Sequence, residues 1–98
     1  MIKVSVMYPN AEGASFNHDY YKTTHMPLVK SRMGSALHYY TVDKCLADGA
    51  GAAPPFVAMC HLIVESIDAF QAAFGPHAKE ILADVANYTN INPVMLIS

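Results

Sequence analysis

Charged side chains are scarce in this 98-residue chain: Asp, Glu, Lys and Arg make up 14% of the residues, against about 25% in an average domain. The six cationic residues are scattered along the chain and form no basic stripe: Lys3, Lys22, Lys30, Arg32, Lys44 and Lys79. Clustered Lys and Arg hold phosphate backbones, so we predict no nucleic-acid partner. No apolar run reaches the ~20 residues of a membrane helix, and we predict no membrane partner. The N-terminus shows no signal-peptide pattern.

Cysteine is also rare, and tryptophan is absent. Cys45 and Cys60 are compatible with a reducing compartment, and we expect a cytoplasmic protein. None of the five histidines is spaced H-x-H or H-x-x-x-H from another, and the cysteines form no C-x-x-C motif. Such spacing is what sets two ligands side by side on one element, so we predict no metal site and no bound cofactor.

Apolar residues are abundant instead, at 53% of the chain. A chain of this length forms one domain, which we expect to span residues 1–98. A small domain leaves much of its surface open to water. Because large apolar patches rarely stay exposed, this excess favours a subunit interface over an unusually apolar monomer.

The pattern along the chain predicts four strands and two helical regions. The strands are expected at 2–8, 36–44, 56–65 and 91–97, and the helical regions follow residues 17 and 66. Asn17 and Ser66 are suitable N-caps. Pro27 requires the first helix to kink or restart, and Gly34 ends it. In the second region a helix restarts at Pro76, with Ile81, Leu82 and Val85 as its buried stripe.

This order of elements is typical of an α+β, ferredoxin-like βαββαβ fold, in which helices cover one face of an antiparallel sheet. The other face would carry apolar side chains of two strands: Met7, Val57, Met59 and Ile63. That face is too apolar to remain in water. We therefore expect a homodimer in which two sheets pack face to face around a shared, barrel-like core, a dimeric α/β barrel.

His25 is the first candidate for chemistry, because imidazole titrates near neutral pH and relays protons. It stands two residues before Pro27, where the helix is expected to restart at the mouth of a cleft between helices and sheet. A helix N-terminus would lower the pKa of His25 and keep the ring neutral as a base. The alternative is a structural histidine that ends a helix and bonds a backbone carbonyl.

Tyrosines are the second group of candidates. Tyr8, Tyr20 and Tyr88 would give an apolar cleft a few phenol donors, the usual composition of a small-molecule pocket. The alternative is core packing with each hydroxyl at the surface. The sequence pattern leaves both possibilities open.

Several stretches together resemble the EthD family of the dimeric α/β-barrel superfamily, over essentially the whole chain. The matching residues are the opening strand and turn Ile2–Pro9, Phe16 with Asp19-Tyr20-Tyr21, the run Thr24–Val29, and Asp84 with Tyr88-Thr89-Asn90. The run Thr24-His25-Met26-Pro27-Leu28 after a Tyr-Tyr helix start is the most specific of them. The resemblance implies functional roles for His25, Tyr20, Tyr21 and Asp84.

The resemblance also implies a homodimer of ferredoxin-like subunits associated with the catabolism or biosynthesis of small organic molecules. The family takes its name from an association with ethyl tert-butyl ether degradation. Related barrels include isomerases, dehydratases and monooxygenases, so the fold alone does not name an activity. One hypothesis is an enzyme in which His25 moves a proton on a small apolar substrate. The others are an accessory protein that binds a hydrophobic metabolite in the same pocket, and a purely structural dimer.

Overall fold

The computed structural model describes all of residues 1–98, and its elements follow the predicted order. The strands are β1 (Ile2–Pro9), β2 (Tyr39–Lys44), β3 (Phe56–Val64) and β4 (Val94–Ile97). The α-helices are α1 (His18–Tyr20), α2 (Met26–Met33), α3 (Ile67–Phe74) and α4 (Ala78–Asp84). The turns are the π-helical η1 (Tyr21–His25) and the 3-10 turns η2 (Gly34–Ala36), η3 (Gly75–His77) and η4 (Val85–Asn87). The chain therefore has the predicted α+β, ferredoxin-like fold.

The four strands form one antiparallel sheet in the order β2-β3-β1-β4. β1 and β3 are the central pair, with Val4 opposite Leu62 and Met7 opposite Met59. β4 pairs only with β1 and lies at an edge, as Pro93 predicts. It begins at Val94 rather than at Ile91, because proline has no backbone N–H to give to the ladder.

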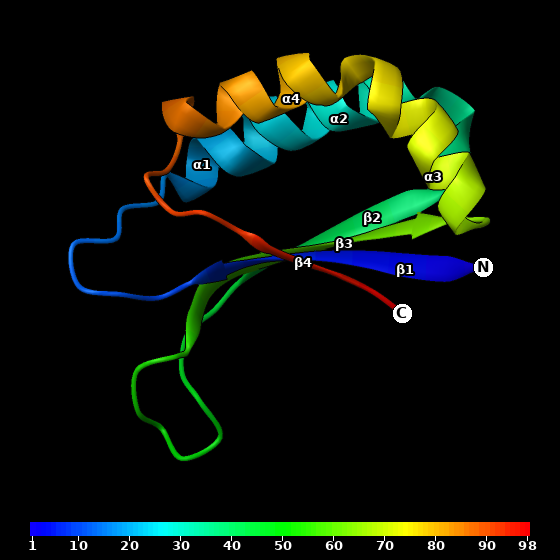
Figure 1. The fold of residues 1–98 in the computed structure, drawn as a ribbon. Coiled ribbons are helices and arrows are strands. Elements are labelled where there is room, and N and C mark those ends of the chain that lie inside the picture. The colour runs from blue at the N-terminus through cyan, green and yellow to red at the C-terminus, as the bar shows by residue number, and fades with distance from the viewer.

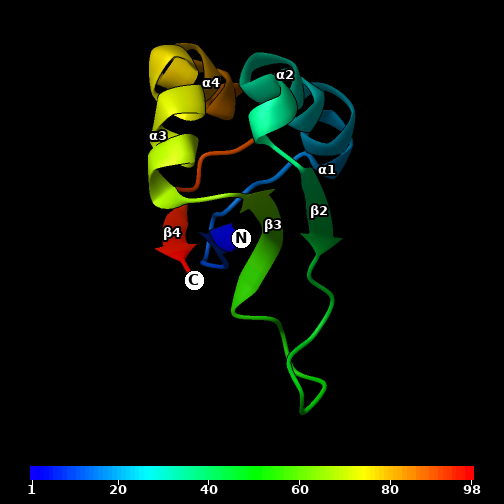
Figure 2. The ribbon, with the colours of Figure 1, turned by 90° about the vertical axis from the view of Figure 1, so that its right-hand side faces the viewer.

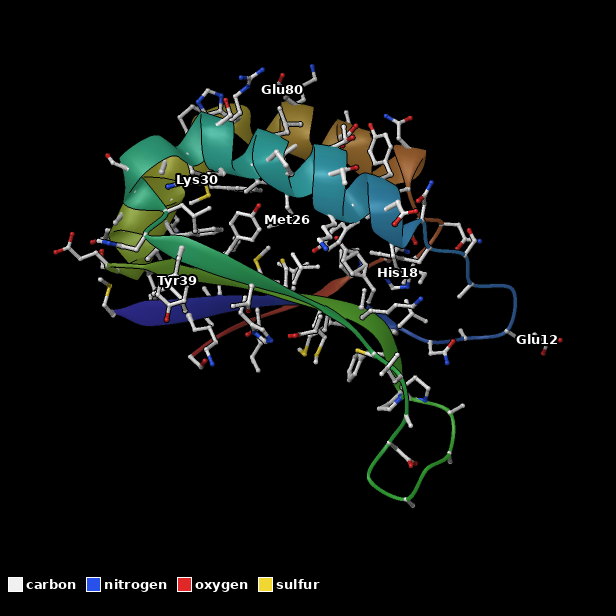
Figure 3. All side chains as sticks on the ribbon, turned by 180° about the vertical axis from the view of Figure 1, so that it is seen from behind. Glu12, His18, Met26, Lys30, Tyr39 and Glu80 are labelled. Carbon is white, nitrogen blue, oxygen red and sulfur yellow. The ribbon has the colours of Figure 1, made fainter.

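All helices lie on one face of the sheet, and the opposite face has no helical cover (Figure 1; Figure 2). The core fills the space between these two layers and is centred on side chains that are almost fully buried, such as Val4, Leu37 and Val64. Met26 points from the helices towards the sheet, and Tyr39 lies on the other side of β2 (Figure 3). Met26 is 1% exposed and Tyr39 58% exposed, which shows how different the two faces are.

The face of the sheet without helices carries the apolar side chains that the two-residue alternation of the strands predicts. Met7 and Met59 face each other across β1 and β3, and Ile63 lies opposite Tyr39 on β2. Met7, Met59 and Ile63 are only partly buried in a single chain. On the same face, Ser5 Oγ and His61 Nδ1 are hydrogen-bonded at 2.8 Å.

Both predicted helix caps are confirmed. The Asn17 side chain accepts a hydrogen bond from the Tyr20 N–H at 3.1 Å, and Ser66 Oγ accepts one from the Ala69 N–H at 3.0 Å. Asn and Ser favour these positions because their oxygens replace the partner that a first-turn N–H lacks.

Pro27 does not break the first helical region. The helix passes through the π-helical turn η1 and continues as α2, which holds Pro27 in its first turn. A wider turn accommodates a proline because the ring removes one N–H donor and crowds the carbonyl four residues earlier. The consequence for the site is that His25, the last residue of η1, is held inside a continuous helical stretch.

Leu82 is a correction to the predicted stripe of the last helix. Ile81 is buried, at 3% exposed, and Val85 is partly buried on the same face, but Leu82 is 56% exposed. One residue along a helix turns the side chain by about 100°, so Leu82 leaves the face that Ile81 and Val85 share. No helix of this chain combines the length and apolar character needed to cross a membrane.

Candidate functional site

A cavity of about 60 Å³ lies between the helical layer and the sheet. Its wall is formed by 15 residues, of which 13 are hydrophobic, and His25 is the one ionisable group besides phenols and a thiol. Val6 and Leu62 on the sheet and Phe70 and Ile81 on the helices form much of the apolar wall. The site is therefore an apolar chamber with one imidazole.

The cavity opens near the β4 edge of the sheet. Three residues of its wall are also exposed to solvent: Leu82 on α4, Pro93, and Met95 on β4. Leu82 is 56% and Met95 49% exposed. The exposure of Leu82 that contradicts the sequence prediction thus places it at the mouth of the cavity.

His25 is oriented by a carboxylate on the second helical region. Its Nδ1 lies 2.9 Å from Oδ2 of Asp84, and the side chains are 5% and 14% exposed. A carboxylate only accepts hydrogen bonds, so Nδ1 carries the hydrogen and donates it. The other ring nitrogen, Nε2, then has a free lone pair, and it makes no hydrogen bond within the protein. The geometry presents Nε2 as the basic atom of the site.

Asp84 is itself held by two more donors. The Tyr20 hydroxyl donates to its Oδ1 at 2.6 Å, and the Asn87 side-chain amide donates to the same oxygen at 2.9 Å. Burial raises the pKa of Asp84, but the hydrogen bonds from Tyr20, Asn87 and His25 outweigh it and the net pKa lies below its usual range. Asp84 therefore stays an anion beside the imidazole.

The pKa of His25 lies below its ordinary value of 6.5. The chief cause is burial, which disfavours the imidazolium, while the hydrogen bond and charge of Asp84 work in the opposite direction. The prediction of a helix N-terminus as the cause is wrong: residues 20 to 26 are all helical, and His25 lies within the stretch rather than at its start. The neutral ring is kept by desolvation, which suits a base at neutral pH.

Aromatic rings surround the imidazole. Tyr21 stacks on His25 with 14° between the planes and 5.6 Å between centroids, and the Tyr88 ring lies 4.6 Å away. The hydroxyls of Tyr8 and Tyr88 are hydrogen-bonded at 2.6 Å. Phe16 packs edge-on against Tyr8, Tyr21 and Tyr88. This packing fixes the ring of His25 from two sides.

The sequence-predicted residues gather around this one site in two groups. His25, Tyr8 and Tyr21 belong to the cavity wall, and Tyr88 contacts the imidazole. Tyr20 and Asp84 are not on the wall but stand behind His25, where they orient it. Sequence reasoning missed Asn87, although its place three residues after Asp84 on a helix is a usable signal.

No group of three or more His, Cys, Asp or Glu side chains is arranged to hold a metal ion. Cys45 and Cys60 are both free thiols. Burial raises the pKa of Cys60, which keeps its thiol protonated and weakly nucleophilic.

The fold and site define a ferredoxin-like α+β protein with a histidine-bearing apolar cavity beneath its helices. Within that class, the model of the EthD domain matches residues 12–92. The chain belongs to the EthD family.

Solved structures are similar over nearly the whole chain. An EthD-like protein of Ralstonia eutropha has 59% identity and a TM-score of 0.95, covering 99% of this chain and 88% of that one. An ethyl tert-butyl ether D (EthD) family protein of Bacillus halodurans has 18% identity and a TM-score of 0.76, covering 100% and 96%. A dimeric ferredoxin-like protein of Thermobifida fusca has 17% identity and a TM-score of 0.59, covering 99% and 88%. No curated protein matches this chain.

Proposed function

We propose that this EthD-family chain is an enzyme that moves a proton on a small, mostly apolar organic molecule, with His25 as the acid and base. The observation that supports it is the His25–Asp84 pair, whose free Nε2 belongs to a residue on the wall of an apolar cavity. Isomerisation and dehydration are the reaction classes that need such a group and no cofactor.

The two members of the pair would have distinct roles. Asp84 holds the tautomer with hydrogen on Nδ1 and stabilises the imidazolium that forms when Nε2 takes a proton. Because the lowered pKa of His25 leaves the ring neutral near pH 7, the base is ready before substrate binds. The proton taken from one atom is then available for return to another.

The wall of the cavity sets the class of substrate. Aliphatic and aromatic side chains dominate it, so burial of apolar surface would supply most of the binding free energy. A cavity of about 60 Å³ is smaller than the ~150 Å³ known to hold benzene. The reacting end of the substrate would occupy the cavity and the remainder would lie in the mouth beside Leu82 and Met95.

A homodimer and a cytoplasmic setting are also part of the proposal. The outer face of the sheet carries the apolar side chains of Met7, Met59 and Ile63, has no cover within the chain and suits a second copy. The similar fold of a dimeric ferredoxin-like protein supports the same arrangement. Two free thiols, Cys45 and Cys60, suit a reducing compartment.

Deuterium exchange tests the function without knowledge of the natural substrate. The protein is incubated in D₂O with small apolar compounds, each of which has one C–H bond made acidic by a neighbouring group. Replacement of that hydrogen by deuterium is followed by NMR. We expect faster exchange with the unaltered chain and His38→Asn, an exposed-histidine control, and none above background with His25→Asn. Exchange that persists in His25→Asn would contradict the proposal. Binding without exchange, unaffected by that substitution, would favour the accessory protein instead.

A further inference from the structure

Tyr21 carries a buried hydroxyl with no hydrogen-bond partner. The residue is 1% exposed, and its hydroxyl is the one buried side-chain polar atom of the chain that lacks a partner. Leaving such a donor unpaired is unfavourable, because burial removes its hydrogen bond to water and nothing replaces it. Tyr21 also belongs to the wall of the cavity. An unpaired donor at a cavity could donate a hydrogen bond to an acceptor atom of a ligand and so stabilise it there.

A second hydrogen is unused nearby. The hydroxyls of Tyr8 and Tyr88, 2.6 Å apart, share one hydrogen bond, although each carries a hydrogen. Either oxygen can donate in that bond, and the phenol that accepts it keeps a hydrogen with no acceptor in hydrogen-bonding geometry. The Tyr8 and Tyr21 rings pack edge to face with centroids 5.5 Å apart, and both residues line the cavity. Two phenols, Tyr8 and Tyr21, therefore belong to one wall, and the free hydrogen of the Tyr8–Tyr88 pair is on that wall when Tyr88 is the donor.

Acceptors are almost absent from the same wall. Apart from His25, the lining side chains present carbon, sulfur or phenol groups. Burial raises the pKa of Tyr8 and of Tyr21 above the ordinary value of 10.0, so both phenols keep their hydrogens and act as donors. The site offers the Tyr21 hydroxyl, the Tyr8–Tyr88 pair and one base, and its complement is a molecule with an oxygen acceptor beside a removable proton.

We propose that the substrate class is an enolisable carbonyl compound, whose oxygen accepts hydrogen bonds from Tyr21 and from the Tyr8–Tyr88 pair while His25 removes a proton from the adjacent carbon. The assignment of the base rests on the function proposed above. The assignment of the oxygen site rests on the unpaired hydroxyls alone.

The step balances without a further reactant. Nε2 of His25 takes the proton, the C–H bond breaks, and its electron pair forms a carbon–carbon double bond. The carbonyl π pair moves to oxygen, and the resulting enolate is stabilised by the two phenol donors. Where a carbon–carbon double bond adjoins the deprotonated carbon, the enolate extends over it, and the imidazolium returns the proton to the far end of that double bond, which completes an isomerisation. Donors aimed at an oxygen that gains charge stabilise the transition state more than the ground state.

Binding of 4-nitrophenol tests the oxygen site separately from proton transfer. Its phenolate resembles an enolate, and its absorbance changes when the oxygen is hydrogen-bonded. We expect Tyr21→Phe to weaken phenolate binding roughly 10- to 100-fold, the usual effect of losing a hydrogen bond to an anion. Tyr39→Phe, on the open sheet face and 58% exposed, is the matched control and should bind as the unaltered chain does. Binding of 4-nitrotoluene, which has no such oxygen, should not respond to either change.

A purely structural role for the Tyr21 hydroxyl predicts that Tyr21→Phe melts at a lower temperature. On our proposal the hydroxyl is unpaired, and its removal relieves a desolvation cost. Tyr21→Phe should then melt at the same or a higher temperature while its binding of phenolate weakens. His25→Asn should still bind phenolate but lose deuterium exchange. Phenolate binding that is absent, or equal in Tyr21→Phe and the unaltered chain, overturns the carbonyl inference and leaves the role of His25 intact. Phenolate binding that depends on Tyr21 without any exchange sustains the oxygen site and removes the catalytic proposal.

Discussion

Asp84 Oδ2 lies 2.9 Å from His25 Nδ1, although the two residues are 59 positions apart in the chain. The contact joins the end of η1 to the end of α4, two segments of the same helical layer. It determines which nitrogen of the imidazole is free. Every expectation about proton transfer depends on this pair.

His25→Asn keeps a side chain of similar size and removes proton transfer. If Nε2 is the base, turnover on a substrate found by the exchange assay should fall roughly 10²–10⁴-fold. The circular dichroism spectrum should be unchanged, because Asn can still donate to Asp84. His38→Asn serves as the control for loss of a histidine elsewhere. Full turnover in His25→Asn would remove the catalytic role.

Asp84→Asn removes the anion beside His25 while its side chain stays nearly isosteric. The charge and hydrogen bond of Asp84 raise the pKa of His25 against the effect of burial, so their loss should lower that pKa further. We expect slower turnover and an acid limb of the pH–rate profile that moves to lower pH. Asn87→Ala, which removes only a donor to Asp84, should produce a smaller change. An acid limb that stays in place in Asp84→Asn would argue against coupling of the two residues.

Stability should fall in mild acid because His25 is buried in its neutral form. Its pKa is below 6.5 in the folded chain and near 6.5 when unfolded, so the unfolded state binds more protons between the two values. The free energy of unfolding should therefore be steady above about pH 6.5 and decline as the pH drops through the folded pKa.

Urea unfolding at a series of pH values measures this decline. His25→Asn should flatten it, and a smaller slope should remain because burial also lowers the pKa of His18. The pKa of Asp84 is lowered in the folded chain. Its protonation should therefore reduce stability only in stronger acid, below the ordinary aspartate pKa of 3.8. An equally steep decline in His25→Asn would assign the effect to other groups.

Met59→Lys should separate the proposed dimer. Met59 lies on the open sheet face opposite Met7, and a charge there would have to be buried between two sheets. Light scattering should give twice 10.7 kDa for the unaltered chain and 10.7 kDa for the variant. Gln71→Lys, on the exposed surface of α3, is the control and should remain dimeric. A stable monomer for the unaltered chain would show that the open face has another role.

The loop between β2 and β3 is predicted to be mobile or to act as an arm over a partner. Residues 46 to 53 are exposed, and the loop projects from the sheet on the side opposite the helices (Figure 1). Asp48 organises its tip: its Oδ1 accepts from the N–H groups of Ala50 at 2.8 Å and Ala52 at 2.9 Å. Asp48→Ala should raise amide hydrogen exchange of the loop several-fold, and protection lost in Met59→Lys would identify it as an arm over the partner.

Local features of this protein were readable from the sequence because they depend on neighbouring residues. The alternation from Ile2 to Tyr8 determined which β1 side chains face the helices, and Asn17 and Ser66 marked both helix starts. These signals come from the two-residue period of a strand and the unpaired N–H groups of a first turn. Asp48 follows similar local rules, since its carboxylate accepts from N–H groups two and four residues further along.

The site depended on contacts that no local pattern encodes. His25 was a candidate from the sequence because of the residues around it, and Asp84 was a candidate because of the family resemblance. Only the packing of the helical layer placed Nδ1 against Oδ2 and left Nε2 unpaired. The cause of the lowered pKa of His25 and the unpaired hydroxyl of Tyr21 likewise follow from burial, which is a property of the whole packed structure rather than of any segment.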